Sequence, residues 1–435
     1  MFQIGGLASG LDTKTLIEQL MQIESRPISI WRKQQDQLRS EAGVWKDVET
    51  RLQALRDKAG ALLSADAFSA RRVSVSNQAV AKASVTSTAT TGQFEIVVTS
   101  LAKAHRIAGI RVADVNAALG ASGAMQINGV GLTVVSTDSL AVVRDKINAL
   151  NAGVRASLID NTLVLESTTT GSASTITVTG DASVLQSLGL DQPTTLQSPA
   201  DAQLTVNGLP ITSASNRLTN LSPGLTVDLV GTGTTIVTVE NDTQAVVDRV
   251  KAFVDQFNST YGFIQEKLAK EATLQGDSTL IRLGFDLRTR VTSPVAGTPA
   301  GELDQLALVG ITTDRYGRLS VDEAKFTKLL TEKPEEVRRL FQATLATDGR
   351  EGVITRLDGM LRLALQTGSG VVPETQEALN DRIKDIDRQI EAFERRLELR
   401  RQHLVQQFTA LEKALSAMQS QSNWLAGQIQ KLQQS

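Results

Sequence analysis

Apolar residues near the end of the chain recur with the spacing of a coiled-coil seam. Successive apolar positions between residues 379 and 432 are mostly four and three residues apart, as in the a and d positions of a heptad. The seam comprises Leu379, Ile383, Ile386, Ile390, Phe393, Leu397, Leu404, Phe408, Leu411, Leu415, Met418, Leu425, Ile429 and Leu432. At about 1.5 Å per residue this helix is roughly 80 Å long. It needs a partner, because one helix cannot bury its own seam.

The start of the chain offers that partner. We expect a helix after Asp12, whose carboxylate can accept the free N–H groups of the first turn. Pro27 interrupts this helix, because proline lacks the N–H that a helix interior requires. A second helix with heptad spacing follows and ends near residue 64. We expect residues 38–62 of this second helix to form an intramolecular hairpin with residues 379–404.

The middle of the chain reads as β-rich. Only 15 residues between Val73 and Ala200 are charged, and Ser, Thr, Ala, Val and Gly dominate. The dipeptides at 160–161 (DN) and 207–208 (NG) separate alternating segments and predict tight hairpin turns. A helix is expected from near Asp138, and a long one from near Thr243. Another hairpin is expected around residues 314–317.

This order predicts an α+β multidomain fold in which the middle is nested between the ends. The paired N- and C-termini form an antiparallel coiled-coil leg, and the β-rich domains form a head. We assign residues 1–37 with 405–435 to a flexible terminal leg and 38–71 with 242–404 to a helical, coiled-coil domain. Residues 72–106 with 201–241 form a β-rich head domain, and 107–200 form an outer β-rich head domain.

Composition narrows the possible functions. The formal net charge of −2 argues against a nucleic-acid binder, and the absence of cysteine removes disulfides and thiolate metal sites. Two histidines, His105 and His403, are too few for a His-rich metal site or a catalytic triad. The acids around residues 314–323 do not match the spacing of an EF-hand. We therefore predict no catalytic site, no cofactor and no metal.

The sequence also carries no signal for membrane insertion. No run approaches ~18 consecutive apolar residues, so we expect no membrane span. The first residues lack the basic and apolar regions of a cleavable signal peptide.

A change in charge along the last helix points to a contact surface. Of the 26 residues from Leu379 to Leu404, 13 are charged, but from Val405 to Ser435 only Glu412, Lys413 and Lys431 are. Because buried charges are costly and amides less so, we expect this last stretch to pack within an assembly. Our candidate contacts with partner subunits are Leu16, Leu20, Ile23, Leu415, Met418, Trp424, Leu425, Ile429 and Leu432.

Three stretches resemble the bacterial flagellar filament cap family, also called hook-associated protein 2. Residues 4–12 (IGGLASGLD), 16–21 (LIEQLM) and 26–28 (RPI) match its opening. A second match is to the flagellin/hook IN motif of axial proteins, at residues 127–129 (ING), 147–148 (IN), 153–156 (GVRA) and 163–165 (LVL). A third, at 309–312 (VGIT) and 317–322 (GRLSVD), is similar to the C-terminal part of cap proteins.

The resemblance implies a structural role and several partners. Such proteins form a ring of about five or six copies at the distal tip of the filament, where they prevent loss of flagellin and promote its polymerisation. The implied partners are other copies of the chain, flagellin, the hook–filament junction proteins and an export chaperone at the C-terminal helix. The implied location is extracellular, after type III export without a cleaved signal.

The sequence is also compatible with two other functions. The Ser- and Thr-rich head would also suit a surface adhesin that binds glycans. The terminal helices would also suit another axial component, such as a junction protein. An enzyme is the least favoured class, because no nucleophile, base and orienting group can be combined from these residues.

Overall fold

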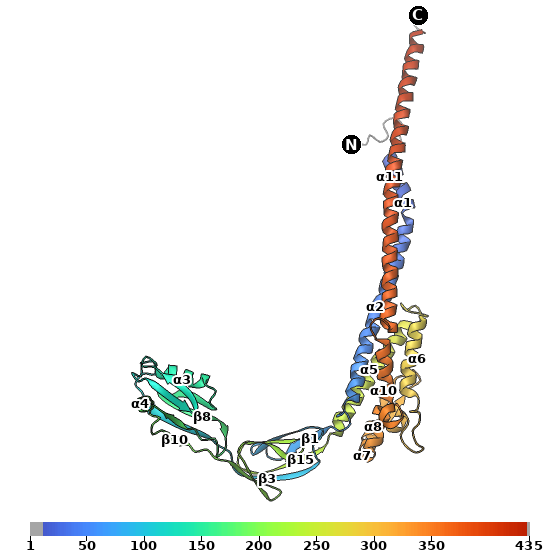
Figure 1. The fold of residues 1–435 in the computed structure, drawn as a ribbon. Coiled ribbons are helices and arrows are strands. Elements are labelled where there is room, and N and C mark those ends of the chain that lie inside the picture. The colour runs from blue at the N-terminus through green and yellow to red at the C-terminus, as the bar shows by residue number, and fades with distance from the viewer. Residues whose placement is uncertain (1–11, 433–435) are drawn as a thin grey trace. The chain divides into compact units, whose positions relative to one another are not determined.

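The protein, described here by a computed structural model, is α+β and multidomain, which confirms the predicted fold class (Figure 1). The structure describes residues 12–432, with the backbone alone at Asn220 and at 430–432. The chain forms two compact units and crosses between them after Ser64 and before Val247. One unit is mainly helical and contains both ends of the described chain. The other is built mainly of strands. The four-part division expected from the sequence stays a prediction.

The first two helices begin and end where the sequence predicts. Helix α1 spans Thr13–Glu24, and the backbone N–H of Thr15 donates to the Asp12 carboxylate at 3.1 Å. Helix α2 spans Arg26–Leu63. Pro27 lies in its first turn, where a missing N–H costs no hydrogen bond, so the proline separates the two helices without breaking either. Residues 1–11, which we assigned to the flexible leg, lie outside the described part.

Helix α11 spans Val371–Leu432 and runs antiparallel to α1 and α2. Three contacts define the register: Gln376 with Trp45, Gln35 with Asp387, and Glu24 with Arg400. The expected pairing of residues 379–404 with 38–62 is therefore wrong for most of its length. The partner of 379–404 is the earlier stretch from α1 to about Trp45. The reason is that α11 begins only at Val371, shortly before Gln376, which contacts Trp45 and Glu49, so the last turns of α2 have no α11 beside them.

The second half of α2 packs instead on the remaining helices of its unit. Gln342 donates to the Leu62 carbonyl at 2.7 Å, Thr260 to the Arg51 carbonyl at 3.2 Å, and Arg56 pairs with Asp358. These elements are α5 (Thr243–Leu268), α6 (Ser278–Thr292), η1 (Leu306–Val309), β16 (Ile311–Thr313), β17 (Leu319–Val321), α7 (Glu323–Glu332), α8 (Pro334–Gln342), α9 (Leu345–Asp348) and α10 (Val353–Ala364). Their core contains Trp45, Phe253, Phe257, Phe326 and Phe341, all fully buried.

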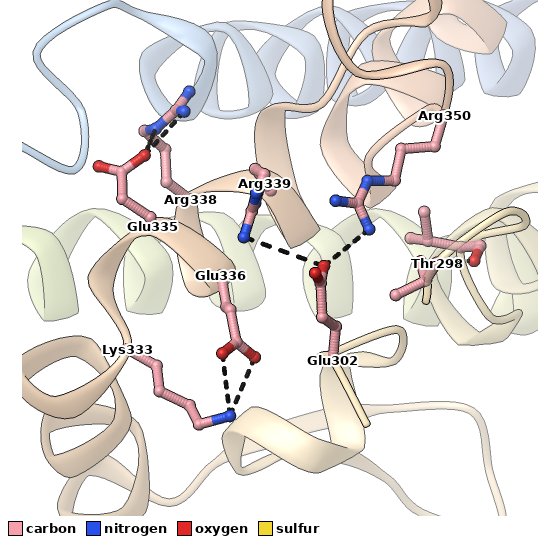
Figure 2. A network of polar contacts seen from close by, with 9 residues as sticks. Thr298, Glu302, Lys333, Glu335, Glu336, Arg338, Arg339 and Arg350 are labelled. Carbon is pink, nitrogen blue, oxygen red and sulfur yellow. Dashed lines mark hydrogen bonds and ion pairs between the residues drawn. The ribbon is translucent and has the colours of Figure 1, made fainter. Parts of the chain in front are cut away.

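Two arginines tie the loop between α6 and η1 to the rest of this unit. Figure 2 shows Arg339 and Arg350 converging on the single carboxylate of Glu302, at 3.9 and 3.0 Å. The Arg350 side chain is only 10% exposed. Because a buried charge is costly without a counter-charge, Glu302 is held in place and the loop with it.

The hairpin expected near residues 314–317 joins β16 to β17 and is confirmed. Its Asp314 side chain accepts the backbone N–H groups of Tyr316 and Arg318, and Asp322 caps α7 through the Lys325 N–H. These carboxylates thus accept hydrogen bonds from the backbone. Within residues 12–432 no group of His, Asp and Glu side chains is arranged to hold a metal ion.

The strand unit begins with two sheets that bury one core between them. One sheet has the order β1-β15-β3-β11-β12 and the other β13-β14-β2, with antiparallel neighbours. The strands are β1 (Arg71–Val75), β2 (Ala81–Val85), β3 (Gly92–Ser100), β11 (Ala202–Val206), β12 (Leu209–Ser213), β13 (Arg217–Ser222), β14 (Leu225–Leu229) and β15 (Gly233–Asn241). Ile96, Val227 and Val237 lie at the centre of the core.

A second core in this unit belongs to the segment inserted between β3 and β11. Its sheets have the orders β10-β4-β8-β7 and β6-β5-β9. The elements are β4 (Ala104–Arg111), β5 (Gly123–Ile127), β6 (Val130–Val134), α3 (Leu140–Ala149), β7 (Val154–Ile159), β8 (Thr162–Thr170), β9 (Val178–Gly180), α4 (Ala182–Leu188) and β10 (Thr194–Gln197). Helix α3 buries Leu140, Val143 and Ile147 in this core, as its spacing predicts.

The two hairpin turns predicted in the strand unit are confirmed. Asp160 and Asn161 join β7 to β8 with φ of 45° and 57°, and Asn207 and Gly208 join β11 to β12 with 49° and 81°. Two successive positive φ values define the type I′ turn, whose twist matches that of paired strands. His105 has a structural role, since its Nδ1 accepts the Ile176 N–H at 2.8 Å in a buried site.

Candidate assembly surface on the terminal helices

The covered part of the α11 seam is held by both apolar and polar contacts. Trp31 meets Phe393 edge to face, and Leu379, Ile386, Ile390 and Leu404 are buried. Gln35, itself 5% exposed, donates its amide to the Asp387 carboxylate. A polar side chain inside a coiled-coil seam favours one register over its alternatives, because any shift leaves the polar group unpaired.

Ion pairs extend this registration along the outer edges of the seam. Arg32 pairs with Glu394 at 3.1 Å, and Arg400 with Glu24 at 3.4 Å. At the start of α1, the side-chain hydroxyl of Thr15 donates to Asp12 and lowers the pKa of that carboxyl. The negative charge at this helix N-terminus complements the helix dipole. The chain therefore fixes where α1 begins and how it lies on α11.

The cover over α11 stops where α1 begins. A groove of about 420 Å³ between the two helices is lined by Ile17 and Met21 of α1 and by Leu397 and Arg401 of α11, among others. The first turn of α1 therefore lies beyond the level of Arg401. Figure 1 shows α11 continuing past that point.

Beyond this point most of the predicted contact residues of α11 are exposed. Leu404 is 7% exposed, whereas Leu411 is 48%, Met418 64% and Leu425 51% exposed. Ile429 and Trp424 are also exposed, and Leu415 is half-buried. The side chain of Leu432 lies outside the part that the structure describes. The result is an apolar stripe along α11, from Leu411 to Ile429, which no described segment of the same chain covers.

Helix α1 carries a second apolar stripe on its outer face. Ile17 and Met21 face α11, while the neighbouring Leu16, Leu20 and Ile23 are 37%, 40% and 57% exposed. The structure thus brings these three predicted residues onto one solvent-facing side. Sequence reasoning missed Ile30, which is 64% exposed and continues the same four-three spacing through Pro27. That spacing was the signal that could have found it.

The two stretches of α11 differ in charge as well as in cover. Charged side chains along the covered stretch form intrahelical pairs, such as Lys384 with Asp381 and Arg395 with Glu391. The uncovered stripe is flanked mainly by Gln, Ser and Ala. An exposed apolar surface with uncharged flanks marks a site for protein contact. In the described part no helix is long and apolar enough to cross a bilayer.

The terminal helices and the β-rich insertion together define a class of protein. A chain whose ends pair as a coiled coil, leave apolar stripes uncovered and enclose β-rich domains is a structural protein that assembles with other chains. Family models then match the chain: "Flagellar hook-associated protein 2" N-terminus over residues 9–105, its C-terminus over 199–420, and the flagellin hook IN motif over 124–169. The protein belongs to the flagellar hook-associated protein 2 family, which confirms the resemblance read from the sequence.

Relatives and a solved structure agree with this assignment. The chain is 28% identical to the A-type flagellar hook-associated protein 2 of Pseudomonas aeruginosa, covering 99% of this chain and 97% of that protein. It is 31% identical to the B-type protein of the same species over 83% and 82% of the two chains. It also resembles the crystal structure of the flagellar cap protein FliD (domains D1-D2-D3) from Escherichia coli, with a TM-score of 0.65 and 27% identity over 78% of this chain and 99% of that one. The adhesin and junction-protein alternatives are not favoured.

Proposed function

We propose that this protein is an oligomeric cap at the distal tip of the flagellar filament, where it retains flagellin and promotes its polymerisation. One observation supports this most directly: the seam of α11 is covered by its own chain up to about Phe408 and mostly exposed from Leu411 to Ile429. A monomer gains nothing from such a stripe, because exposed apolar surface is costly in water. The stripe is suited to partner subunits.

The proposed mechanism divides the work between the two ends of the molecule. The β-rich domains close the tip, and the stripes on α1 and α11 dock on open subunit sites of the filament. Rearrangement of these helices admits one flagellin at a time. A small ring on a helical filament meets inequivalent sites, which favours stepwise movement over a locked state. The contact residues are Leu16, Leu20, Ile23, Leu415, Met418, Trp424, Leu425, Ile429 and Leu432.

The same assignment suggests further partners and a location. We expect about five or six copies in the ring. We also expect contacts with the hook–filament junction proteins, and binding of an export chaperone to the C-terminal helix before secretion. The protein would act outside the cell at the tip, after export without a cleaved signal peptide. We expect no catalytic activity and no cofactor.

The test places charge in the apolar stripe and observes filament growth. A variant with Leu425→Asp and Ile429→Asp, expressed in cells that lack the native gene, should leave the β-rich domains folded and abolish filament elongation. Filament length is measured by electron microscopy, and folding by circular dichroism of the purified protein. The matched control is Ser420→Asp with Asn423→Asp, which adds the same charge at exposed polar positions of the same helix.

The two variants together separate loss of docking from a general effect of charge. Normal filaments with the control and none with the stripe variant support the proposal. Full-length filaments with the stripe variant would show that the stripe does not dock, and the proposed mechanism would be wrong.

A further inference from the structure

We infer that the uncovered α11 stripes of neighbouring copies pack against each other, parallel and in register, as a bundle of identical helices. This inference rests on the proposed function and names the partner that covers the stripe before the cap meets the filament. The occupant is a second copy of residues 408–432, and not another segment of the same chain.

The phase of the heptads changes where the cover by α1 ends. In the covered part, positions 383, 390, 397 and 404 repeat every seven residues, with 386 and 393 between them. From Phe408 the repeat restarts as Phe408, Leu415, Ser422 and Ile429 at a, and Leu411, Met418, Leu425 and Leu432 at d. The column of Leu397 and Leu404 continues every seven residues to Leu411, but the step of four residues from Leu404 to Phe408 is a stutter that moves the flanking apolar column to its other side. The last segment therefore presents a rotated seam, which suits a partner other than α1.

Symmetry selects that partner. In a closed ring of identical subunits every residue stands at the same height as its copies. Among the described residues, no other segment reaches the level of α11 beyond α1. The neighbour of this stretch in the ring is therefore the same stretch of the next copy. Identical helices side by side in one ring are parallel, so each a and d layer meets itself.

The near-absence of charge in the last segment of α11 suits a parallel bundle of identical helices. The earlier part of α11 is too highly charged to suit it. Parallel identical helices bring e positions beside g positions five residues earlier, and like charges there are repulsive. The e positions are Glu412, Gln419 and Ala426, and the facing g positions are Gln407, Ala414 and Gln421. Only Glu412 is charged, and a glutamine faces it. By contrast, 13 of the 26 residues from Leu379 to Leu404 are charged.

The absence of cysteine from the chain allows a direct test. Three full-length variants each carry one cysteine at a d position: Leu411→Cys, Met418→Cys and Leu425→Cys. A fourth, Ser420→Cys, places the cysteine at the outward f position as a control. After mild oxidation, disulfide-linked dimers are measured by non-reducing electrophoresis. Native mass spectrometry of each variant before oxidation establishes whether the oligomer is present.

We expect all three d-position variants to form several-fold more dimer than Ser420→Cys, because parallel registration brings every d layer beside its copy. Cross-linking at only one of the three would indicate antiparallel tails and overturn the inference. No cross-linking in a variant that is oligomeric by mass would also overturn it, while leaving the proposed cap intact. Failure of the cap itself is detected separately, in the filament-growth experiment with Leu425→Asp and Ile429→Asp.

Discussion

Trp31 of α2 meets Phe393 of α11 edge to face, with ring centroids 5.3 Å apart and planes at 88°. The same level of the hairpin holds the ion pair between Arg32 and Glu394, and the Arg396 guanidinium lies 4.9 Å from the Phe393 ring centroid. Two segments more than 300 residues apart in the chain are thereby registered at one layer, close to the junction of α1 and α2. The position of the uncovered stripe depends on this registration.

The aromatic pair should contribute a measurable coupling energy. Trp31→Ala, Phe393→Ala and the double variant form a double-mutant cycle, and we expect a coupling of about 1 kcal/mol, typical of an edge-to-face pair beyond simple burial. The measurement is urea unfolding followed by helical circular dichroism at 222 nm. Strictly additive effects of the two single substitutions would show that the rings touch without stabilising the hairpin.

Trp45 and Trp424 should respond in opposite ways to truncation. Trp45 is fully buried, so Trp45→Ala is expected to destabilise the helical unit by about 3–5 kcal/mol, through lost burial and the cavity left behind. Trp424 is 62% exposed, so Trp424→Ala should change the free energy of unfolding by about 0.5 kcal/mol or less. The effect of Trp424→Ala should appear in filament growth instead. Equal destabilisation by the two substitutions would contradict the exposures found here.

Gly317 should tolerate no side chain. It has φ +82°, and an added Cβ would lie 2.6 Å from the Tyr261 ring, whereas Gly301 has φ +90° with open space around it. Gly301→Ala thus reports backbone strain alone, and Gly317→Ala reports strain plus a clash. We expect Gly317→Ala to cost about 1–3 kcal/mol more than Gly301→Ala, measured by thermal unfolding. A smaller loss for Gly317→Ala than for Gly301→Ala would contradict the contact with Tyr261.

Acidification should loosen the α3 region through Asp138. The hydrogen bond from the Lys146 ammonium, with a second from the Val135 N–H, lowers the pKa of the Asp138 carboxyl. A carboxyl whose pKa is lower in the folded state stabilises that state at pH values above the pKa of the unfolded chain, about 3.9. That stabilisation is lost as the pH falls from about 4 through the folded-state pKa.

The measurement compares hydrogen exchange of peptides from β6 and α3 in the wild type and in Asp138→Asn at matched pH. The wild type should be better protected at neutral pH, and the difference should shrink below pH 4. A difference that is independent of pH would show that the carboxylate charge is not what matters.

The sequence predicts most of the secondary structure, because its signals are local. Asp12 and Pro27 mark where helices begin, and each needs only its own turn of backbone. Asn207 and Gly208 adopt positive φ within a single hairpin. These features follow from the conformations that a few adjacent residues can adopt, so they are readable without knowledge of distant parts of the chain.

The register of the paired helices and the exposure of their side chains do not follow from such local signals. Heptad spacing indicates that a helix has a partner but not which level of the partner it meets, so the pairing of residues 38–62 with 379–404 is wrong for most of its length. The convergence of Arg339 and Arg350 on Glu302 involves segments with no sequence signal in common. The exposed Ile30 follows the same spacing as Leu16 and Leu20 but lies beyond the proline, where the first helix was expected to stop.

By itself, the sequence determined the helices, the turns, the β-rich middle and the two apolar seams of the terminal helices, since each depends on periodicity or on the local backbone. Only the tertiary structure decided which part of the α11 seam the chain covers for itself. That choice depends on contacts between residues more than 300 positions apart, which place the start of α1 beyond Arg401 and the first turns of α11 beside Trp45 and Glu49. Burial of apolar surface is a property of such pairings, and no stretch of sequence specifies it alone.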